Sequence, residues 1–303
     1  MSVVVMAGQR TTHNRLRRRL SRAGLHIFLS ILAFIFAWPI LYAVYASLRP
    51  YGEIVANPNG FFSTPATLNL DNYWTFWDSA NYPMFFMNTM VITIPAIILT
   101  LFTASMVAFA VSRFSWRFNL LVLMLFTAGN LLPPQVIIVP LYRLYNVIPG
   151  IPLPFMDNGR LYDNAIGLVL IHATFQTGFC TFVLSNYMKT LSKELVEAAM
   201  VDGAGVFTIY RKIILPLCRP ALAALGTLLF VWIYNDFFWS VMLFKSGDKR
   251  PITAALNNLS GTFFTDPTLV AAGSIMAAIP TVVLYLLLQR FFISGLTLGS
   301  TKG

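Results

Sequence analysis

Leu191–Pro220 is a polar stretch of about thirty residues between long apolar runs, and its residue types suit contact with a partner protein. Glu197 and Asp202 offer negative charge, and the two alanines that follow Glu197 allow a partner to approach closely. Gly203 allows a sharp bend, because a glycine reaches backbone conformations that other residues avoid. These residue types favour recognition by another protein, and the alternative is an amphipathic helix pair at the membrane surface without a partner.

The stretch also carries the signals of two short helices joined by a tight elbow. Residues 192–201 form the first, with Ser192 placed to cap its N-terminus. Gly203 ends this helix, since a helix C-terminus often needs a left-handed residue. The second helix covers residues 206–214, and we expect Pro216 to end it because proline has no N–H to donate.

A second group of polar residues lies inside the apolar runs. Asp236 is the one acidic residue that we place within a membrane span, where an acid is costly and marks either a pathway or a buried partner. With its neighbours it could line a translocation path, where rings stack on a sugar and polar groups bind its hydroxyls. It could also form a polar clamp between helices. Both interpretations stay open, and the candidate path residues are Tyr234, Asn235, Asp236, Phe237, Asn88 and Gln135.

Signatures of catalysis are missing from the sequence. It contains no HExxH zinc motif and no GxxxxGK[ST] phosphate-binding loop, so an ATPase activity would have to come from another chain. His172 is the one histidine deep in a span, and no GxSx motif accompanies it. Cys180 and Cys218 lack CxxC spacing, which favours small buried side chains. We therefore predict no catalytic residue, no metal site and no cofactor in this chain.

Composition indicates an integral membrane protein. Of 303 residues, 57% are hydrophobic and 11% are charged, with a mean hydropathy of +0.70. A soluble protein carries about a quarter charged residues. The net charge of +10 does not indicate nucleic-acid binding, because the basic residues flank apolar runs instead of clustering with aromatics.

Six apolar runs follow a basic leader at residues 1–25. The first run spans ~23 residues, enough to cross a ~30 Å hydrocarbon core. Prolines interrupt the third run. Backbone groups that lose a hydrogen bond at these prolines need polar partners from neighbouring helices. The six predicted spans cover about residues 26–48, 84–111, 119–142, 164–187, 221–244 and 268–292.

Charge indicates which ends face the cytoplasm. Six spans put both termini and the elbow on one side, and that side holds fifteen of the 21 Lys and Arg residues, against six on the other. Basic residues are enriched in cytoplasmic segments. We therefore predict cytoplasmic termini and a cytoplasmic elbow.

The elbow reads E-A-A-x3-G-x9-I-x-L-P, which resembles the EAA loop of the permease subunits of bacterial ABC importers. Asp202 and Ala204 extend the match to a D-G-A sequence typical of sugar permeases, whereas Gly205 replaces the usual Ser or Thr. By this resemblance the residues that couple the permease to its ATPase are Glu197, Ala198, Ala199, Asp202, Gly203, Ile213, Leu215 and Pro216.

Other stretches narrow the resemblance to the second permease of the maltose-type carbohydrate importers. The C-terminal sequence Gly295–Gly303 is similar to the G-L-T-x-G-x-x-K-G ending of that branch. The sequences at Glu53–Pro58 and Asp71–Tyr73 fit it too. The resemblance covers roughly residues 20–303.

The resemblance implies an all-α integral membrane protein with six transmembrane helices. A permease domain at 26–303 contains a cytoplasmic coupling loop at 190–217, between helices 4 and 5. It implies a multi-pass protein of the bacterial inner membrane, with membrane lipid around it. The implied partners are a second permease subunit, an ATP-binding subunit dimer that holds ATP and Mg, and an extracytoplasmic solute-binding protein. The implied cargo is a sugar, such as an oligosaccharide or a sugar derivative.

Two alternatives remain open. One is an ABC importer permease for another small solute, such as a peptide, an amino acid or a polyol phosphate. The other is a secondary transporter, which would usually show more spans or an internal repeat and coupling acids in the membrane.

Overall fold

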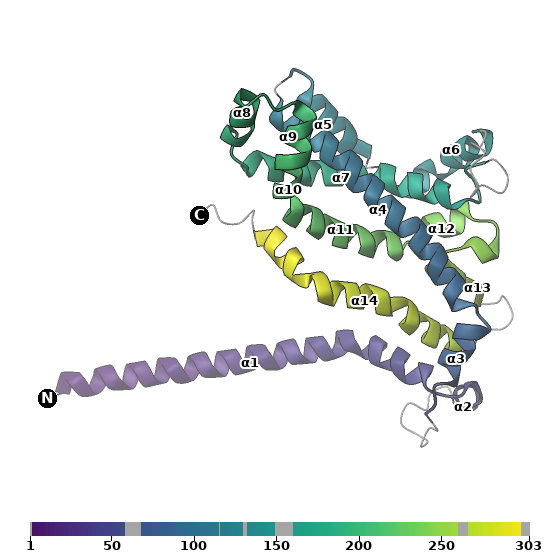
Figure 1. The fold of residues 1–303 in the computed structure, drawn as a ribbon. Coiled ribbons are helices and arrows are strands. Elements are labelled where there is room, and N and C mark those ends of the chain that lie inside the picture. The colour runs from purple at the N-terminus through teal and green to yellow at the C-terminus, as the bar shows by residue number, and fades with distance from the viewer. Residues whose placement is uncertain are drawn as a thin grey trace. The chain divides into compact units, whose positions relative to one another are not determined.

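A computed structural model describes residues 2–57, 68–114, 116–129, 132–148, 160–259 and 266–297, with side chains described from residue 21 on except at 258–259 and 290–297. All the regular elements in these ranges are helical (Figure 1). In chain order they are α1 (Ser2–Ser47), α2 (Tyr51–Ala56), α3 (Asp71–Asp78), α4 (Tyr82–Arg113), α5 (Asn119–Ala128), α6 (Pro134–Val147), α7 (Ala165–Thr190), α8 (Glu194–Val201), α9 (Val206–Ile209), the π-helix η2 (Tyr210–Ile214), α10 (Leu215–Leu217), α11 (Arg219–Tyr234), α12 (Phe238–Leu243), the 3₁₀-helix η3 (Gly247–Lys249), α13 (Ile252–Leu259) and α14 (Pro267–Thr297).

Four helices are long and apolar enough to cross a membrane, and they match the first, second, fourth and sixth predicted spans. They are Ser21–Ser47 of α1, α4, α7 and Pro267–Gln289 of α14. A fifth span is counted if Val206–Leu217 and Arg219–Tyr234, which meet at a 72° bend, are taken as one. The prediction of six spans is therefore not confirmed by this count.

The two remaining predicted spans are interrupted where the sequence disfavours a helix. The third divides into α5 and α6, and α6 starts at Pro134, directly after Pro133 in the N-cap position. A proline constrains the residue before it away from helical geometry, which explains a helix boundary at this pair. The fifth, expected to be continuous over residues 221–244, divides into α11 and α12 around Asn235 and Asp236.

The chain divides into two compact units, which we describe separately. Unit 1 comprises Met1–Trp74 and Pro267–Ile275. Within it, the Asn72 amide donates to the backbone carbonyls of Ser47 (2.9 Å) and Arg49 (2.8 Å), and Thr268 Oγ1 donates to Asn72 Oδ1. The Asp71–Tyr73 sequence thus holds the end of α1.

Unit 2 comprises Thr75–Asp266 and Met276–Gly303, and α4 and α7 pack side by side at its centre (Figure 1). Small residues on α4 allow this approach: Ala96, Ala104 and Ala108 are fully buried. Close approach at small residues is a usual way for membrane helices to associate. The hydroxyls of Thr103 and Thr177 lie 3.1 Å apart and join the two helices.

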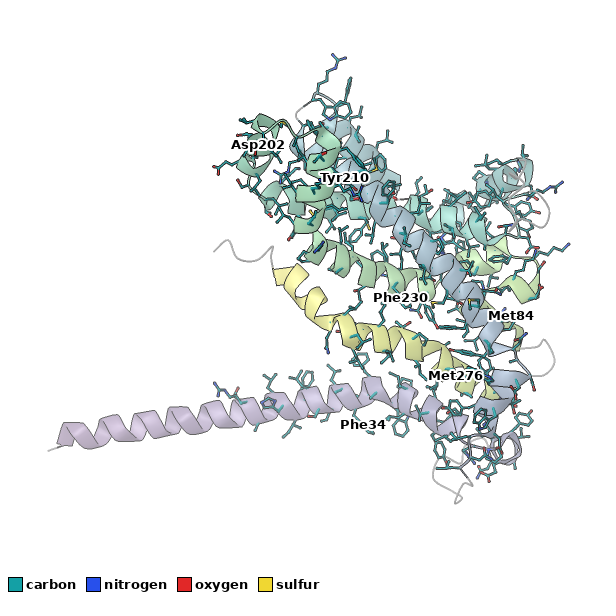
Figure 2. The ribbon with its side chains drawn as sticks, viewed as in Figure 1. Phe34, Met84, Asp202, Tyr210, Phe230 and Met276 are labelled. Atoms are coloured by element: carbon teal, nitrogen blue, oxygen red, sulfur yellow. The ribbon has the colours of Figure 1, made fainter. Side chains whose placement is uncertain are left out.

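The two ends of the α4–α7 pair carry different elements. Helices α8 and α9 lie at one end, whereas α12 and α13 lie at the other (Figure 1). In Figure 2, Asp202 and Tyr210 mark the first of these ends and Met84 marks the second. The two polar regions singled out in the sequence are therefore separated along the length of the central helices.

Candidate functional site

The first half of the elbow (residues 190–217) folds as its sequence predicts. Ser192 Oγ accepts a hydrogen bond from the Glu194 N–H (3.2 Å), and the helix runs from Glu194 to Val201. Gly203 then takes the left-handed conformation with φ of 79°. The Ala204 N–H donates to the Ala199 carbonyl (2.9 Å), which closes the turn.

The second half of the elbow differs from the prediction. We expected Pro216 to end a helix over residues 206–214, but the helical chain runs past Pro216 to Leu217 and breaks at Cys218. The reason is the wide π turn before it, in which the Leu215 N–H donates to the Tyr210 carbonyl. Pro216 therefore lies in the first turn of the next short helix, α10. A proline is tolerated there, because the N–H groups of a first turn have no partner inside the helix.

The motif residues divide between two faces of the elbow. Ala199 is buried, and Ile213 and Leu215 pack against the same apolar cluster of α4, α7 and α11. The other face is exposed, and it includes Glu197, Ala198, Asp202 and Gly203. One set of motif residues thus fixes the elbow to the membrane helices, while the other is free to meet a partner.

Large apolar side chains accompany the exposed acids. Val201 is 88% exposed and Phe207 is 63% exposed. A surface that combines exposed apolar groups with charge is typical of a protein–protein contact. The exposed side of the elbow therefore has the character of a docking surface.

Contacts that the sequence did not reveal tie the elbow to α4. The Tyr210 hydroxyl lies 2.8 Å from that of Ser105, and its ring packs on Phe109 with ring centroids 5.4 Å apart. Arg113, the last residue of α4, donates to the carbonyls of Met188 and Leu191, where α7 passes into the elbow. The sequence marked Arg113 only as a charge at a span end, and nothing singled out Ser105.

Asp236 lies at the break between α11 and α12, and not inside a continuous helix. Its carboxylate accepts hydrogen bonds from the N–H groups of Trp239 (3.3 Å) and Ser240 (3.0 Å) and from the Ser240 hydroxyl (2.8 Å). Side-chain acceptors at this position satisfy helix N–H groups that have no partner inside the helix. These contacts make the Asp236 carboxylate a cap of α12.

The other candidate path residues have different surroundings. Tyr234 is fully buried and donates to the Ala277 carbonyl (3.0 Å). Asn235 and Phe237, on either side of Asp236, are exposed. Gln135 on α6 is exposed as well, whereas Asn88 on α4 is half-buried. The break therefore brings two exposed candidates together beside Tyr234 and Asp236, while Asn88 and Gln135 lie on other elements.

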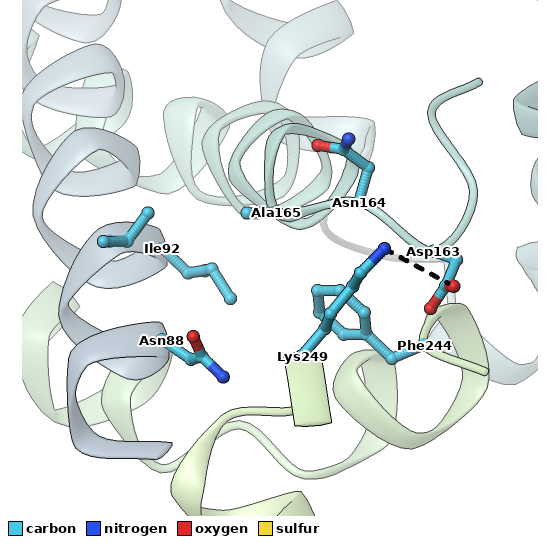
Figure 3. A pocket seen from close by; sticks show the side chains of 8 residues that line it. Asn88, Ile92, Asp163, Asn164, Ala165, Phe244 and Lys249 are labelled. Atoms are coloured by element: carbon cyan, nitrogen blue, oxygen red, sulfur yellow. Dashed lines mark ion pairs between the residues drawn. The ribbon is translucent and has the colours of Figure 1, made fainter. Parts of the chain in front are cut away.

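Asn88 borders a small cavity at the α12–α13 end of unit 2. Its amide donates to the Asp248 carbonyl (2.7 Å), and the cavity of about 220 Å³ reaches to Asp163 and Lys249 (Figure 3). The ion pair drawn there joins Lys249 Nζ to Asp163 Oδ2 at 4.0 Å. No pattern in the sequence singled out Asp163, whose φ of 60° is rare outside glycine.

Asp163 ties the start of α7 to the segment after α12. It accepts hydrogen bonds from the N–H groups of Lys245 and Ser246 (2.9 Å each) and from the Ser246 hydroxyl (2.6 Å). Desolvation by burial would raise the pKa of this carboxyl, but these hydrogen bonds and the Lys249 charge outweigh it and lower the pKa. Asp163 therefore connects the start of α7 to the segment after α12 in its carboxylate form.

The residues described by the structure contain no group of three or more His, Cys, Asp or Glu side chains placed to hold a metal ion. The polar groups of Asp163 and Asp236 make contacts within the chain, and the elbow combines such contacts with an exposed face.

Comparison with known proteins gives consistent matches. Residues 96–293 match the sequence family described as "Binding-protein-dependent transport system inner membrane component". The arabinooligosaccharides transport system permease protein AraQ of Halalkalibacterium halodurans is 32% identical over 92% of this chain and 96% of its own length. The melibiose/raffinose/stachyose import permease protein MelC of Bacillus subtilis is 32% identical over 79% of this chain and 83% of its own length.

A solved structure extends the similarity to the fold. A bacterial ABC transporter involved in the import of the acidic polysaccharide alginate contains a chain similar to this one, with a TM-score of 0.75 and 22% sequence identity. The match covers 90% of this chain and 97% of that one.

Proposed function

Because the chain belongs to the family of binding-protein-dependent transport system inner membrane components, we propose that it is the permease subunit through which an ABC importer carries a sugar into the cytoplasm. One observation supports this most: the E-A-A elbow is anchored on one face and exposed on the other. The names of the similar permeases, among them AraQ and MelC, favour an oligosaccharide as the cargo.

The proposed topology has six membrane crossings in the bacterial inner membrane. Helices α5 and α6 together form the third crossing, and α11 and α12 form the fifth with its break. The termini and the elbow then face the cytoplasm, which agrees with the excess of Lys and Arg on that side.

The proposed mechanism is alternating access driven by other subunits. An ATP-binding subunit dimer holds ATP and Mg, and its closure moves the elbow of this chain and that of a second permease subunit. Because Tyr210, Arg113 and the buried side of α8 attach the elbow to α4 and α7, this movement passes directly to the membrane helices. An extracytoplasmic solute-binding protein delivers the sugar to the opposite face.

The proposed translocation path runs past the break between α11 and α12. Asn235 and Phe237 are exposed there, so an amide and an aromatic ring are available to sugar hydroxyls and sugar faces. Gln135 and Asn88 are further candidates on other elements. Tyr234 and Asp236 instead make hydrogen bonds within the chain on either side of the break.

Uptake of a radiolabelled oligosaccharide by reconstituted complexes tests this function. Glu197→Lys and Gly203→Pro should abolish uptake while the protein stays in the membrane, because they alter the exposed charge and the turn of the elbow. Asp78→Lys, a reversal of an exposed acid outside the elbow, is the matched control and should transport normally. Normal uptake by both elbow variants would refute the coupling role.

A further inference from the structure

Asp236 forms a joint at the break that follows α11. Its carboxylate caps α12, and its backbone carbonyl accepts a hydrogen bond from Thr253 Oγ1 of α13. The residue therefore connects the end of α11 to both α12 and α13.

His172 of α7 faces this joint. Its side chain is about 5% exposed, and Nε2 lies 3.7 Å from Asp236 Oδ2. That separation is longer than a hydrogen bond, which joins such atoms at ~2.9 Å. Within the described residues Nε2 has no hydrogen-bond partner, and leaving a buried polar atom unpaired costs free energy. A shift of less than ~1 Å would satisfy this atom with the Asp236 carboxylate.

Other charged side chains are absent from the interiors of the helices around this pair. Helix α4 carries only Arg113, at its last position, and α7 carries only Lys189 besides His172. Helix α11 carries only Arg219, at its first position, and the described side chains of α12 and α13 are uncharged.

The remaining titratable groups near the pair have contacts of their own. Tyr234 donates to the Ala277 carbonyl, and Cys180 is fully buried on α7. Asp163 and Lys249 pair with each other before the start of α7. A proton on His172 would therefore act mainly on Asp236.

We propose that His172 is a positioning residue that closes on Asp236 and thereby holds the break between α11 and α12 in its resting geometry. This inference rests on the proposed transport function, in which α11 moves with the elbow. A closed pair fixes α12 to α7 and resists that movement. Protonation of His172 adds an attraction between opposite charges, so acid strengthens the pair.

The consequence is a measurable restraint on ATP hydrolysis. When no solute-binding protein is present, the assembled complex should hydrolyse ATP more slowly at about pH 6 than at about pH 8, because acid favours the charged imidazole. At each pH, the rate of the complex is divided by the rate of the isolated ATP-binding subunit. The corrected rates at the two pH values should differ roughly threefold, which is the size of effect that a single ion pair produces. His172→Gln should remove this difference and raise the rate at the lower pH.

Two further variants serve as controls. His26→Gln replaces an exposed histidine on α1 and should keep the wild-type pH profile. Ser240→Ala removes one cap contact but keeps the Asp236 charge, so it should keep the pH dependence as well. If His172→Gln does not assemble, His172→Asn provides the second test.

A wild-type profile that is flat between these pH values would overturn the proposal without any variant. So would a histidine variant that keeps the wild-type profile. Either result, in complexes that still assemble and import sugar, refutes the role of His172 alone. Failure of the wild-type chain to bind an ATP-binding subunit would instead refute the transport function.

Discussion

The hydroxyl of Tyr210 lies 2.8 Å from the hydroxyl of Ser105, and this contact joins the π turn of the elbow to the middle of α4. Both side chains are buried, with 6% and 1% exposure. π turns within helices often mark functional positions. The contact gives the elbow a direct attachment to a central helix in addition to its covalent links to α7 and α11.

Tyr210→Phe should weaken this attachment without creating an unpaired group. Ser105 Oγ keeps its bond to the Phe102 carbonyl, so the expected loss is about 1 kcal/mol for one buried hydrogen bond. The thermal unfolding midpoint of the purified protein measures it. Tyr285→Phe, at an exposed tyrosine of α14, is the control. Equal midpoints for the two variants would show that the Ser105 contact contributes nothing.

Gly203→Ala should destabilise the elbow because φ is 79° at this position. No atom lies within 4 Å of the added Cβ, so the cost is the backbone strain, about 1 kcal/mol.

Gly205→Ala is a matched control two residues away. It also meets no atom within 4 Å, but its φ is −67°, which alanine adopts freely. It should be neutral or stabilising by up to ~1 kcal/mol. Equal effects of the two substitutions on the unfolding midpoint would contradict the turn as described.

Asp163→Asn should lower stability at neutral pH, because it removes the charge that Lys245, Ser246 and Lys249 stabilise. Asparagine tolerates the left-handed backbone, so the substitution adds no backbone strain. The native pKa of Asp163 is lowered, and its stabilisation is therefore complete above the unfolded value of ~4 and is lost as pH falls through the native value. Unfolding midpoints measured from neutral to acidic pH should converge, and a constant gap would contradict this role of the carboxylate.

Val201→Asp should prevent binding of the ATP-binding subunit while leaving the fold intact. Val201 is 88% exposed, and burial of one such side chain in an interface is worth about tenfold in affinity or more. Recovery of the ATP-binding subunit with the tagged chain measures this effect. Val55→Asp, at another exposed valine on α2, should leave recovery unchanged. Full recovery with Val201→Asp would place the interface elsewhere.

Local signals predicted the first half of the elbow well. Ser192 and Gly203 act through their own backbone neighbours, so their roles follow from residue type and spacing. The helix break at Pro133 and Pro134 has the same local origin.

Other features could not be predicted because they depend on contacts between distant segments. Ser105 meets Tyr210 and His172 faces Asp236 only because α4, α7 and α11 pack together. The route of the chain past Pro216 depends on a π turn that no single residue specifies. The sequence around Asp236 reads as a continuous apolar run, and hydropathy alone does not show that this acid caps a new helix.

Purification of the tagged protein from detergent-solubilised native membranes, with identification of everything that accompanies it, tests the coupling role of the elbow most directly. We predict recovery of a second permease, an ATP-binding subunit and a secreted solute-binding protein, with the ATP-binding subunit lost from Glu197→Lys. Recovery of this chain alone, under conditions that keep a reference ABC importer intact, would contradict the coupling role.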